Sequence, residues 1–178
     1  IDLTTNDNTK KWVPIGKTNS TYVPTSYPFS GNYAGNNKTI NILMSYSSGT
    51  ELTLGLFGCV KNGSVKDISV SGSITTDGDS TVKLAAGIVS YLENGTVDGC
   101  VNDVSIAIKN ENVQGAKTGG IVGYLCDSKI YNSINRGQVL LLSDGHAGGI
   151  VGSLFGTENK IYNCYNDNIV SVYNGYSA

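Results

Sequence analysis

A four-residue phrase recurs four times along this chain at nearly constant spacing. Each copy begins with glycine, continues with two apolar residues and ends with glycine or serine; the copies are 55–58, 87–90, 120–123 and 149–152. Their second residues are 32, 33 and 29 residues apart. A repeat of about 30 residues cannot bury its own apolar face, so it must stack on its neighbours. The spacing therefore predicts a solenoid.

Each repeat contains three short apolar segments separated by turn residues. A second segment follows the glycine phrase, with copies at 65–68, 97–100, 130–133 and 161–164, and a third apolar stretch follows that one. Three strands and three turns are what one rung of a parallel β-helix requires, with neighbouring rungs about 4.8 Å apart. We therefore predict an all-β, right-handed parallel β-helix of four to five rungs, the hand following from the general preference for right-handed crossovers.

The predicted rungs divide the chain into an N-terminal segment and four repeats. Residues 1–50 make up the N-terminal segment and first rung, and the repeats cover about 54–85, 86–118, 119–147 and 148–178. Solenoids need polar caps, and neither end of this sequence shows one. We expect a single domain that belongs to a longer protein.

The N-terminal segment differs from the repeats. We expect a Gly/Asn turn at 34–37 and a loop at 17–28 that contains two prolines. Trp12 is interpreted as a packing anchor where the core begins, with stacking against a sugar ring as the alternative.

Alternation along the first segment of each repeat predicts which side chains face the core. Ile121, Leu125 and their equivalents are expected to point inward, whereas Tyr91 and Tyr124 would point outward. The opposite register stays open, because Phe57 and its equivalents are also apolar and a shift of one residue exchanges the two faces.

Asparagine recurs at equivalent turn positions. One column contains Asn102, Asn135 and Asn166, and another contains Asn132 and Asn163. Asparagine tolerates the left-handed conformation that tight corners need, and amides stacked at rung spacing hydrogen-bond along the axis. We interpret both columns as structural ladders rather than ligand sites.

The four cysteines are predicted to be free thiols. Cys100 and Cys164 share a column, but Ser133 occupies the rung between them. This places them about 9.6 Å apart, beyond the roughly 7 Å that a disulfide spans between Cα atoms. The other two cysteines fall in different columns, no Cys-x-x-Cys pair occurs, and the one histidine, His146, lies in another segment. We therefore expect no metal site and no cofactor.

Catalysis finds little support in the repeat pattern. β-Helix enzymes that act on polysaccharides use clustered carboxylates, often with calcium, together with basic side chains. No column pairs carboxylates convincingly on successive rungs. The segment 77–79 (Asp-Gly-Asp) is interpreted as a solvated loop, with a calcium loop as the alternative. We expect no catalytic residues, and a carbohydrate-active β-helix enzyme remains the alternative hypothesis.

Composition also limits the partners. The formal charge is −2 and Arg136 is the one arginine, so no basic patch is available to attract nucleic acid. No run reaches the roughly 18 apolar residues of a membrane span. We expect neither nucleic-acid binding nor membrane insertion by this segment.

One predicted surface feature indicates ligand binding. Tyr131 and Tyr162 occupy one outward column on neighbouring rungs, and Tyr165 is close by. Exposed tyrosines in such a row can bind sugar rings or a protein partner. A ladder that only supports strand pairing is the alternative.

The repeats resemble the GLUG repeat family of bacterial surface and secreted proteins, which includes adhesin-like proteins and regions beside IgA-cleaving protease domains. The matching segments are 55–58, 120–125 and 161–166, and 12–16 and 29–33 resemble the segment that often precedes such repeats. That segment commonly continues with Asp-Gly-Asn-Gly, whereas this chain has Ala-Gly-Asn-Asn at 34–37.

The resemblance implies an extracellular module at the bacterial cell surface. Such a module would be adhesin-like, binding a glycan or a protein of the host or a neighbouring cell, or it would serve as a rigid stalk. The family supplies no catalytic residues. A third hypothesis is a filament, because open strand edges at uncapped ends allow end-to-end stacking of β-helices.

Overall fold

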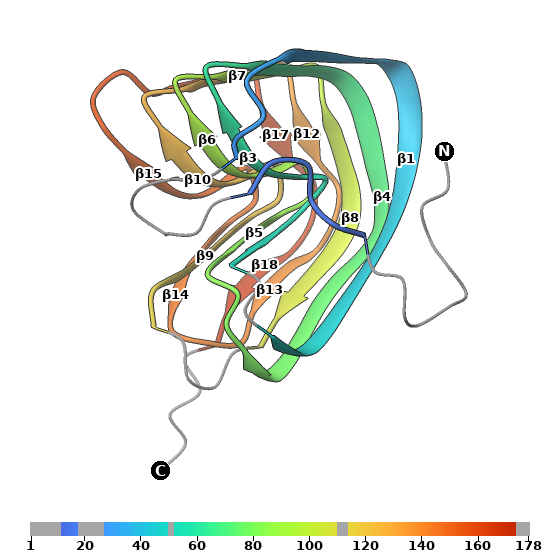
Figure 1. Ribbon diagram of the computed structural model, residues 1–178, viewed down its shortest axis with the longest axis vertical. Helices are drawn as coiled ribbons and strands as arrows, with labels where there is room; N and C mark the ends of the chain where they lie inside the picture. The colour runs from blue at the N-terminus through green and yellow to red at the C-terminus, as the bar shows by residue number, and fades with distance from the viewer. Residues whose placement is uncertain (1–11, 18–26, 50–51, 110–113, 174–178) are drawn as a thin grey trace.

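The computed structural model describes residues 12–17, 27–49, 52–109 and 114–173. These residues form an all-β solenoid of about 4 turns, in which the strands pair in parallel (Figure 1). The predicted parallel β-helix is thereby confirmed. The described residues include no helix that is long and apolar enough to span a bilayer.

Three sheets surround the core. The largest has ten strands and curves along one side of the molecule; it contains β1 (Asn32–Gly49), β4 (Ser64–Ser80), β7 (Thr96–Asp98), β8 (Val101–Ile108), β11 (Lys129–Tyr131), β12 (Ile134–Asn135), β13 (Val139–Leu141), β16 (Lys160–Tyr162), β17 (Tyr165–Asn166) and β18 (Val170–Val172). The second sheet contains β3 (Phe57–Lys61), β6 (Val89–Glu93), β10 (Val122–Cys126) and β15 (Val151–Phe155). The third contains β2 (Thr53–Leu54), β5 (Leu84–Ala86), β9 (Ala116–Gly119) and β14 (Gly145–Gly148).

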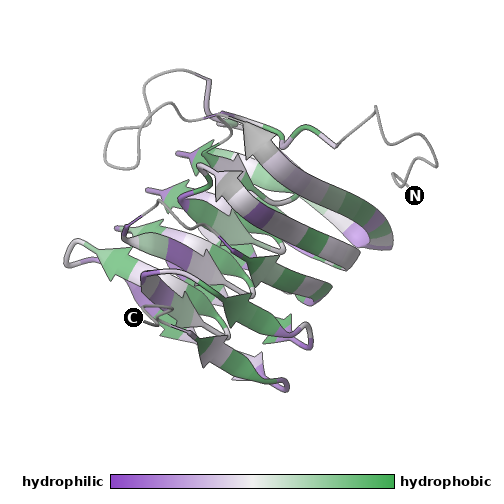
Figure 2. Cartoon of the chain, turned by 90° about the horizontal axis from the view of Figure 1, so that it is seen from below, coloured by the Kyte–Doolittle hydropathy of each residue, from purple (hydrophilic) through white to green (hydrophobic). Residues whose placement is uncertain are grey.

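The strand register follows the period of the sequence. Val60 pairs with Leu92, Leu92 with Leu125, and Leu125 with Leu154. Each apolar column therefore runs along the solenoid axis, and Figure 2 shows the rungs stacked one beyond the next with apolar residues on their strands. Stacking identical positions excludes water from every rung except those at the ends, which is the main driving force for such a fold.

Tyr91 and Tyr124 point away from the main core, as expected, but they do not reach solvent. Their side chains are 3% and 9% exposed, and they form a second apolar cluster with Cys59 and Leu84. The two four-stranded sheets meet at a corner that points toward the large sheet (Figure 1). The face of β3 and β6 that is turned away from the main core therefore packs against β5 instead of facing solvent. Phe57 and its equivalents belong to the main core, so both faces of this sheet are buried.

The N-terminal segment covers one end of the solenoid. Trp12 packs against the main core and its Nε1 donates a hydrogen bond to the Gly55 carbonyl at 3.3 Å, as expected of a packing anchor. The rings of Phe29 and Tyr33 lie 5.2 and 5.4 Å from that of Phe57. These aromatic residues shield the first rung from water.

One local expectation for the loops is confirmed and one is wrong. Residues 34–37 are part of β1, and the predicted Gly/Asn turn lies there as a corner within the strand, where Asn36 and Asn37 have positive φ of 51° and 57° and the register shifts between Ala34 and Lys38. Segment 77–79 lies inside β4, where Asp77 forms an ion pair with Lys109 at 3.4 Å. Both strands run through the corner that separates shorter strands in the later rungs, and Asn37 and Asp67 have positive φ at that corner. Of the predicted loop at 17–28, residues 18–26 lie outside the described residues, and Lys17 pairs with Tyr27.

Within each asparagine column, side-chain hydrogen bonds join one rung to the next along the solenoid axis. Asn102 Nδ2 donates to Asn135 Oδ1 at 2.6 Å, and Asn135 Nδ2 donates to Asn166 Oδ1 at 2.7 Å. Asn163 Nδ2 donates to Asn132 Oδ1 at 2.7 Å. The columns differ in backbone conformation, because positive φ occurs at Asn132 and Asn163 but not at the other three. Asn102 and Asn135 instead accept the N–H two residues later, which holds the chain at the turn.

The cysteines are free thiols, as predicted. Cys59 and Cys100 are fully buried, and burial raises the pKa of each thiol to about 12. Ser133 lies between Cys100 and Cys164 in their column; its Oγ accepts the Cys100 N–H at 3.2 Å.

At the opposite end of the solenoid, the last described rung exposes apolar side chains. Side chains that continue the core columns on the last rung are exposed, among them Leu154 at 56%, whereas Leu125 one rung earlier is fully buried. The other large apolar side chains exposed on this rung are Phe155, Ile161, Tyr162, Tyr165, Ile169, Val172 and Tyr173.

Candidate functional site

The outer face of β11 and β16 brings the predicted tyrosines together. Tyr131 and Tyr162 are direct partners in the parallel ladder, and so are Lys129 and Lys160. Because side chains alternate along a strand, the lysine and tyrosine of each strand share the outer face while the residue between them faces the core. Ile130 is accordingly fully buried.

The tyrosines are accessible to different degrees. Tyr162 is 71% exposed and Tyr131 is half-buried. Tyr165 is also exposed, but it lies beyond the corner at Asn163 and pairs with Ile134. The structure therefore joins two of the three predicted binding residues in one row and places the third on the next strand.

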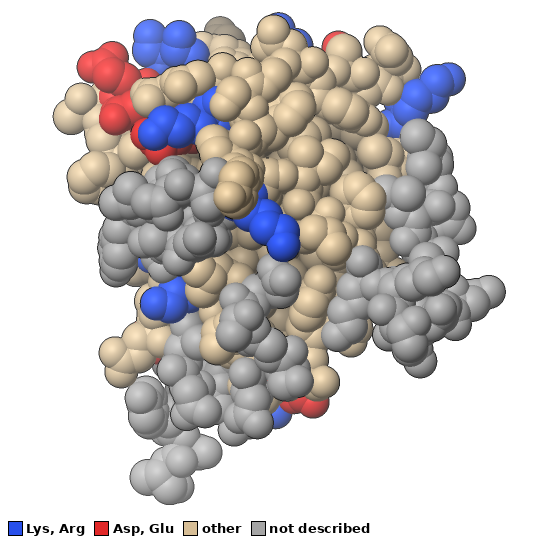
Figure 3. Space-filling model, in the orientation of Figure 1, with Lys and Arg blue, Asp and Glu red and all other residues tan. Residues whose placement is uncertain are grey.

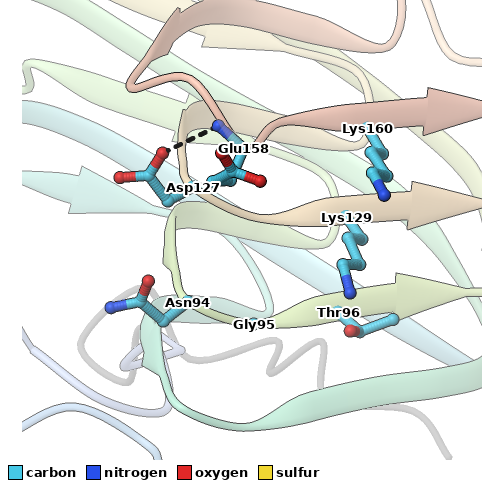
Figure 4. Close-up of a pocket in the computed structure, with 7 residues that line it drawn as sticks. All are labelled: Asn94, Gly95, Thr96, Asp127, Lys129, Glu158 and Lys160. Carbon is cyan, nitrogen blue, oxygen red and sulfur yellow. Dashed lines mark hydrogen bonds between the residues drawn. The ribbon is translucent and has the colours of Figure 1, made fainter.

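A pocket of about 340 Å³ adjoins the two lysines. It lies where the turns that follow β6, β10 and β15 meet the beginnings of β7, β11 and β16. Its lining residues are Asn94, Gly95, Thr96, Asp127, Lys129, Glu158 and Lys160 (Figure 4). Its volume is within the range of pockets that bind small ligands.

Asp127 has a structural role in this pocket. Its backbone is left-handed, with φ of 43°, at the corner position that Asn62 and Asn94 occupy in the preceding rungs. Its Oδ1 accepts hydrogen bonds from the N–H groups of Thr157 at 2.9 Å and Glu158 at 3.1 Å. These bonds hold the turn between β15 and β16, and the Oδ2 atom has no hydrogen-bond partner among the described residues.

Lys129 and Lys160 have no carboxylate partner within the described part of the chain. The ion pairs there join Lys61 to Glu93 at 2.8 Å and Lys109 to Asp77 at 3.4 Å. The two free ammonium groups come from adjacent strands, whose backbones are about 4.8 Å apart. Figure 4 shows them on one side of the pocket and the carboxylates of Asp127 and Glu158 on the other.

The surface around this site is mixed in charge. Figure 3 shows positive and negative side chains next to one another over the part of the molecule where β6, β10 and β15 lie in Figure 1. Much of the remaining visible surface is uncharged. This pattern is consistent with a net charge of −2.

The pairing of Asp127 and Glu158 in one pocket was missed from the sequence. These two residues do not occupy equivalent positions in their repeats, because Glu158 lies in a turn of four residues and Asp127 in one of two residues. A sequence signal exists: the last interval between glycine phrases is 29 residues, but the last interval between second segments is 31. The two additional residues therefore lie in this turn.

Among the described residues, no group of three or more His, Cys, Asp and Glu side chains is arranged to hold a metal ion. Comparison of the chain with known protein families, curated proteins and solved structures found no match.

Proposed function

We propose that this chain is a non-catalytic, adhesin-like module of an extracellular bacterial surface protein. Its ligand, a glycan or a protein of a host or neighbouring cell, would bind the outer face of β11 and β16. The observation that carries this proposal is the row of Tyr131 and Tyr162 beside the unpaired Lys129 and Lys160. Aromatic side chains with polar tips are favoured in binding surfaces. The resemblance to GLUG repeats supports the extracellular location.

Binding by the purified chain to arrays of glycans and of host matrix proteins tests this proposal. The double variant Tyr131→Ala/Tyr162→Ala is expected to lose at least about tenfold in affinity, since each lost aromatic contact costs about 1 kcal/mol or more. A matched control, Tyr27→Ala/Tyr173→Ala, removes two tyrosines that are also exposed but lie elsewhere. It should bind as the wild type does. Equal binding by all three proteins contradicts the proposed face, and no binding by the wild type favours a rigid stalk.

A carbohydrate-active enzyme is the second candidate function. It is favoured by one observation, that Asp127 and Glu158 line the same pocket as two lysines. Release of reducing ends from a glycan, abolished by Glu158→Gln, would establish this alternative and overturn the non-catalytic proposal.

A filament subunit is the third candidate. The exposed apolar rung at one end favours association, but the aromatic residues over the other end oppose repeated head-to-tail stacking. Sedimentation over a wide concentration range distinguishes a filament, which grows with concentration, from a monomer or closed dimer.

A further inference from the structure

We infer that the outer face of β11 and β16 recognises a carbohydrate that carries carboxylate groups, with one carboxylate bound between Lys129 and Lys160. This inference rests on the proposed binding function and names the chemical class of its ligand. It follows from three features: the unpaired lysines, the carboxylates opposite them, and the tyrosines farther along the same strands.

The two paired lysines favour an anion between them. Their Cα atoms are register partners on adjacent parallel strands, and like charges directly across a ladder destabilise it. No carboxylate of the described residues pairs with either ammonium group. A carboxylate has two oxygens that can each accept a charge-assisted hydrogen bond from one lysine, so a single sugar carboxylate would relieve the repulsion.

The acidic side of the pocket selects against anions that lack hydroxyl groups. Asp127 and Glu158 lie opposite the lysines (Figure 4), and ionised carboxylates act only as acceptors. They repel a second negative charge but accept hydrogen bonds from hydroxyl groups. Asp127 is already oriented by two backbone N–H groups through Oδ1, which leaves Oδ2 for a ligand. A sugar acid combines the two required groups, a carboxylate and neighbouring hydroxyl donors, whereas the phosphodiester backbone of DNA offers charge without a hydroxyl group.

The tyrosines extend the site along the strands. Tyr131 and Tyr162 lie two residues after the lysines, so they are about 6.6 Å farther along the same outer face. The exposed ring of Tyr162 offers an apolar surface for the C–H face of a sugar. A ligand with at least two sugar units would therefore place its carboxylate at the lysines and an adjacent ring at the tyrosines.

The experiment begins with an array of glycans that contain uronic or sialic acids and their neutral counterparts. Calorimetry then compares polygalacturonate oligomers with their methyl esters, which keep the rings but lose the charge. The wild type is expected to prefer the acid by about tenfold or more, and this preference should shrink at high salt because the charged groups are near the surface.

The variant Lys129→Gln/Lys160→Gln should lose most of that preference and bind acid and ester similarly. The matched control Lys17→Gln/Lys38→Gln removes the same charge from two exposed positions outside the column of Tyr131 and Tyr162 and should keep the preference. Equal preference in the wild type and the Lys129/Lys160 variant overturns the inference, as does wild-type binding to neutral glycans alone. Wild-type binding to proteins but to no acidic glycan overturns the inference while leaving the proposed binding function intact.

Discussion

Single buried side chains join neighbouring rungs in this protein, and Cys100 is an example. Its Sγ lies 3.6 Å from the carbonyl oxygen of Val65 on the preceding rung. Its N–H donates to Ser133 Oγ on the following rung at 3.2 Å. Burial raises the pKa of its thiol from 9.0 to about 12, because the thiolate would lose its hydration in the core.

This raised pKa predicts lower stability at alkaline pH. Above about pH 9 the thiol ionises in the unfolded chain but stays protonated in the folded one, so the unfolded state binds fewer protons and is favoured as pH rises. We expect Cys100→Ser to reduce this loss of stability. Serine already occupies the equivalent position on the next rung, at Ser133, so it fits this column. Between about pH 7.5 and pH 10.5 the wild type should lose about 2 kcal/mol more unfolding free energy than the variant.

Denaturant unfolding at the two pH values measures this difference. Cys59, whose thiol is also buried, remains in both proteins, so its titration cancels from the comparison. Identical pH dependence in the two proteins would contradict the assigned role of Cys100.

The turns between strands determine how the three sheets pack against one another. Glycines in these turns allow the backbones to approach closely. Gly120 joins β9 to β10, and a Cβ atom there would overlap the Asn135 side chain and the Gly149 carbonyl oxygen. The glycine phrase of one segment therefore packs directly against the asparagine ladder of another. This contact links two turns that are distant along each rung.

Gly120→Ala is expected to destabilise the protein by about 2–4 kcal/mol, because either the ladder or the turn must move. The control Gly78→Asn changes a glycine whose Cβ would meet no atom within 4 Å and whose φ of 45° suits asparagine. Its effect should stay within about 0.5 kcal/mol. Thermal unfolding followed by circular dichroism gives both values, and a smaller loss for Gly120→Ala than for the control would show that the contact is unimportant.

The two ends of the whole molecule differ in how their apolar columns are covered. Aromatic residues of the N-terminal segment pack over the first rung, while the last rung presents its core positions to solvent. In a solenoid each rung is stabilised by its nearest neighbours. A side chain in a core column should therefore contribute less to the free energy of unfolding on the exposed last rung than on an inner rung.

Leu125→Ala and Leu154→Ala test this in one column, since these leucines are register partners. Leu125 is fully buried, and its truncation should cost about 3 kcal/mol through lost burial and a cavity. Leu154 is 56% exposed, and its truncation should cost less than about 1 kcal/mol. Urea unfolding at low protein concentration measures both. Equal losses would indicate that another surface covers the last rung in solution.

Much of the fold could be predicted because a parallel stack places equivalent residues on top of one another. The period of the sequence therefore determined the solenoid, the pairing of Tyr131 with Tyr162 and the position of Ser133 between two cysteines. The tertiary structure alone decided the burial of Tyr91 and Tyr124, because that depends on the angle at which two sheets meet. It also decided the pocket, where a turn lengthened by two residues brings Glu158 to Asp127. Periodicity specifies contacts along the axis, whereas contacts around each rung depend on the corners.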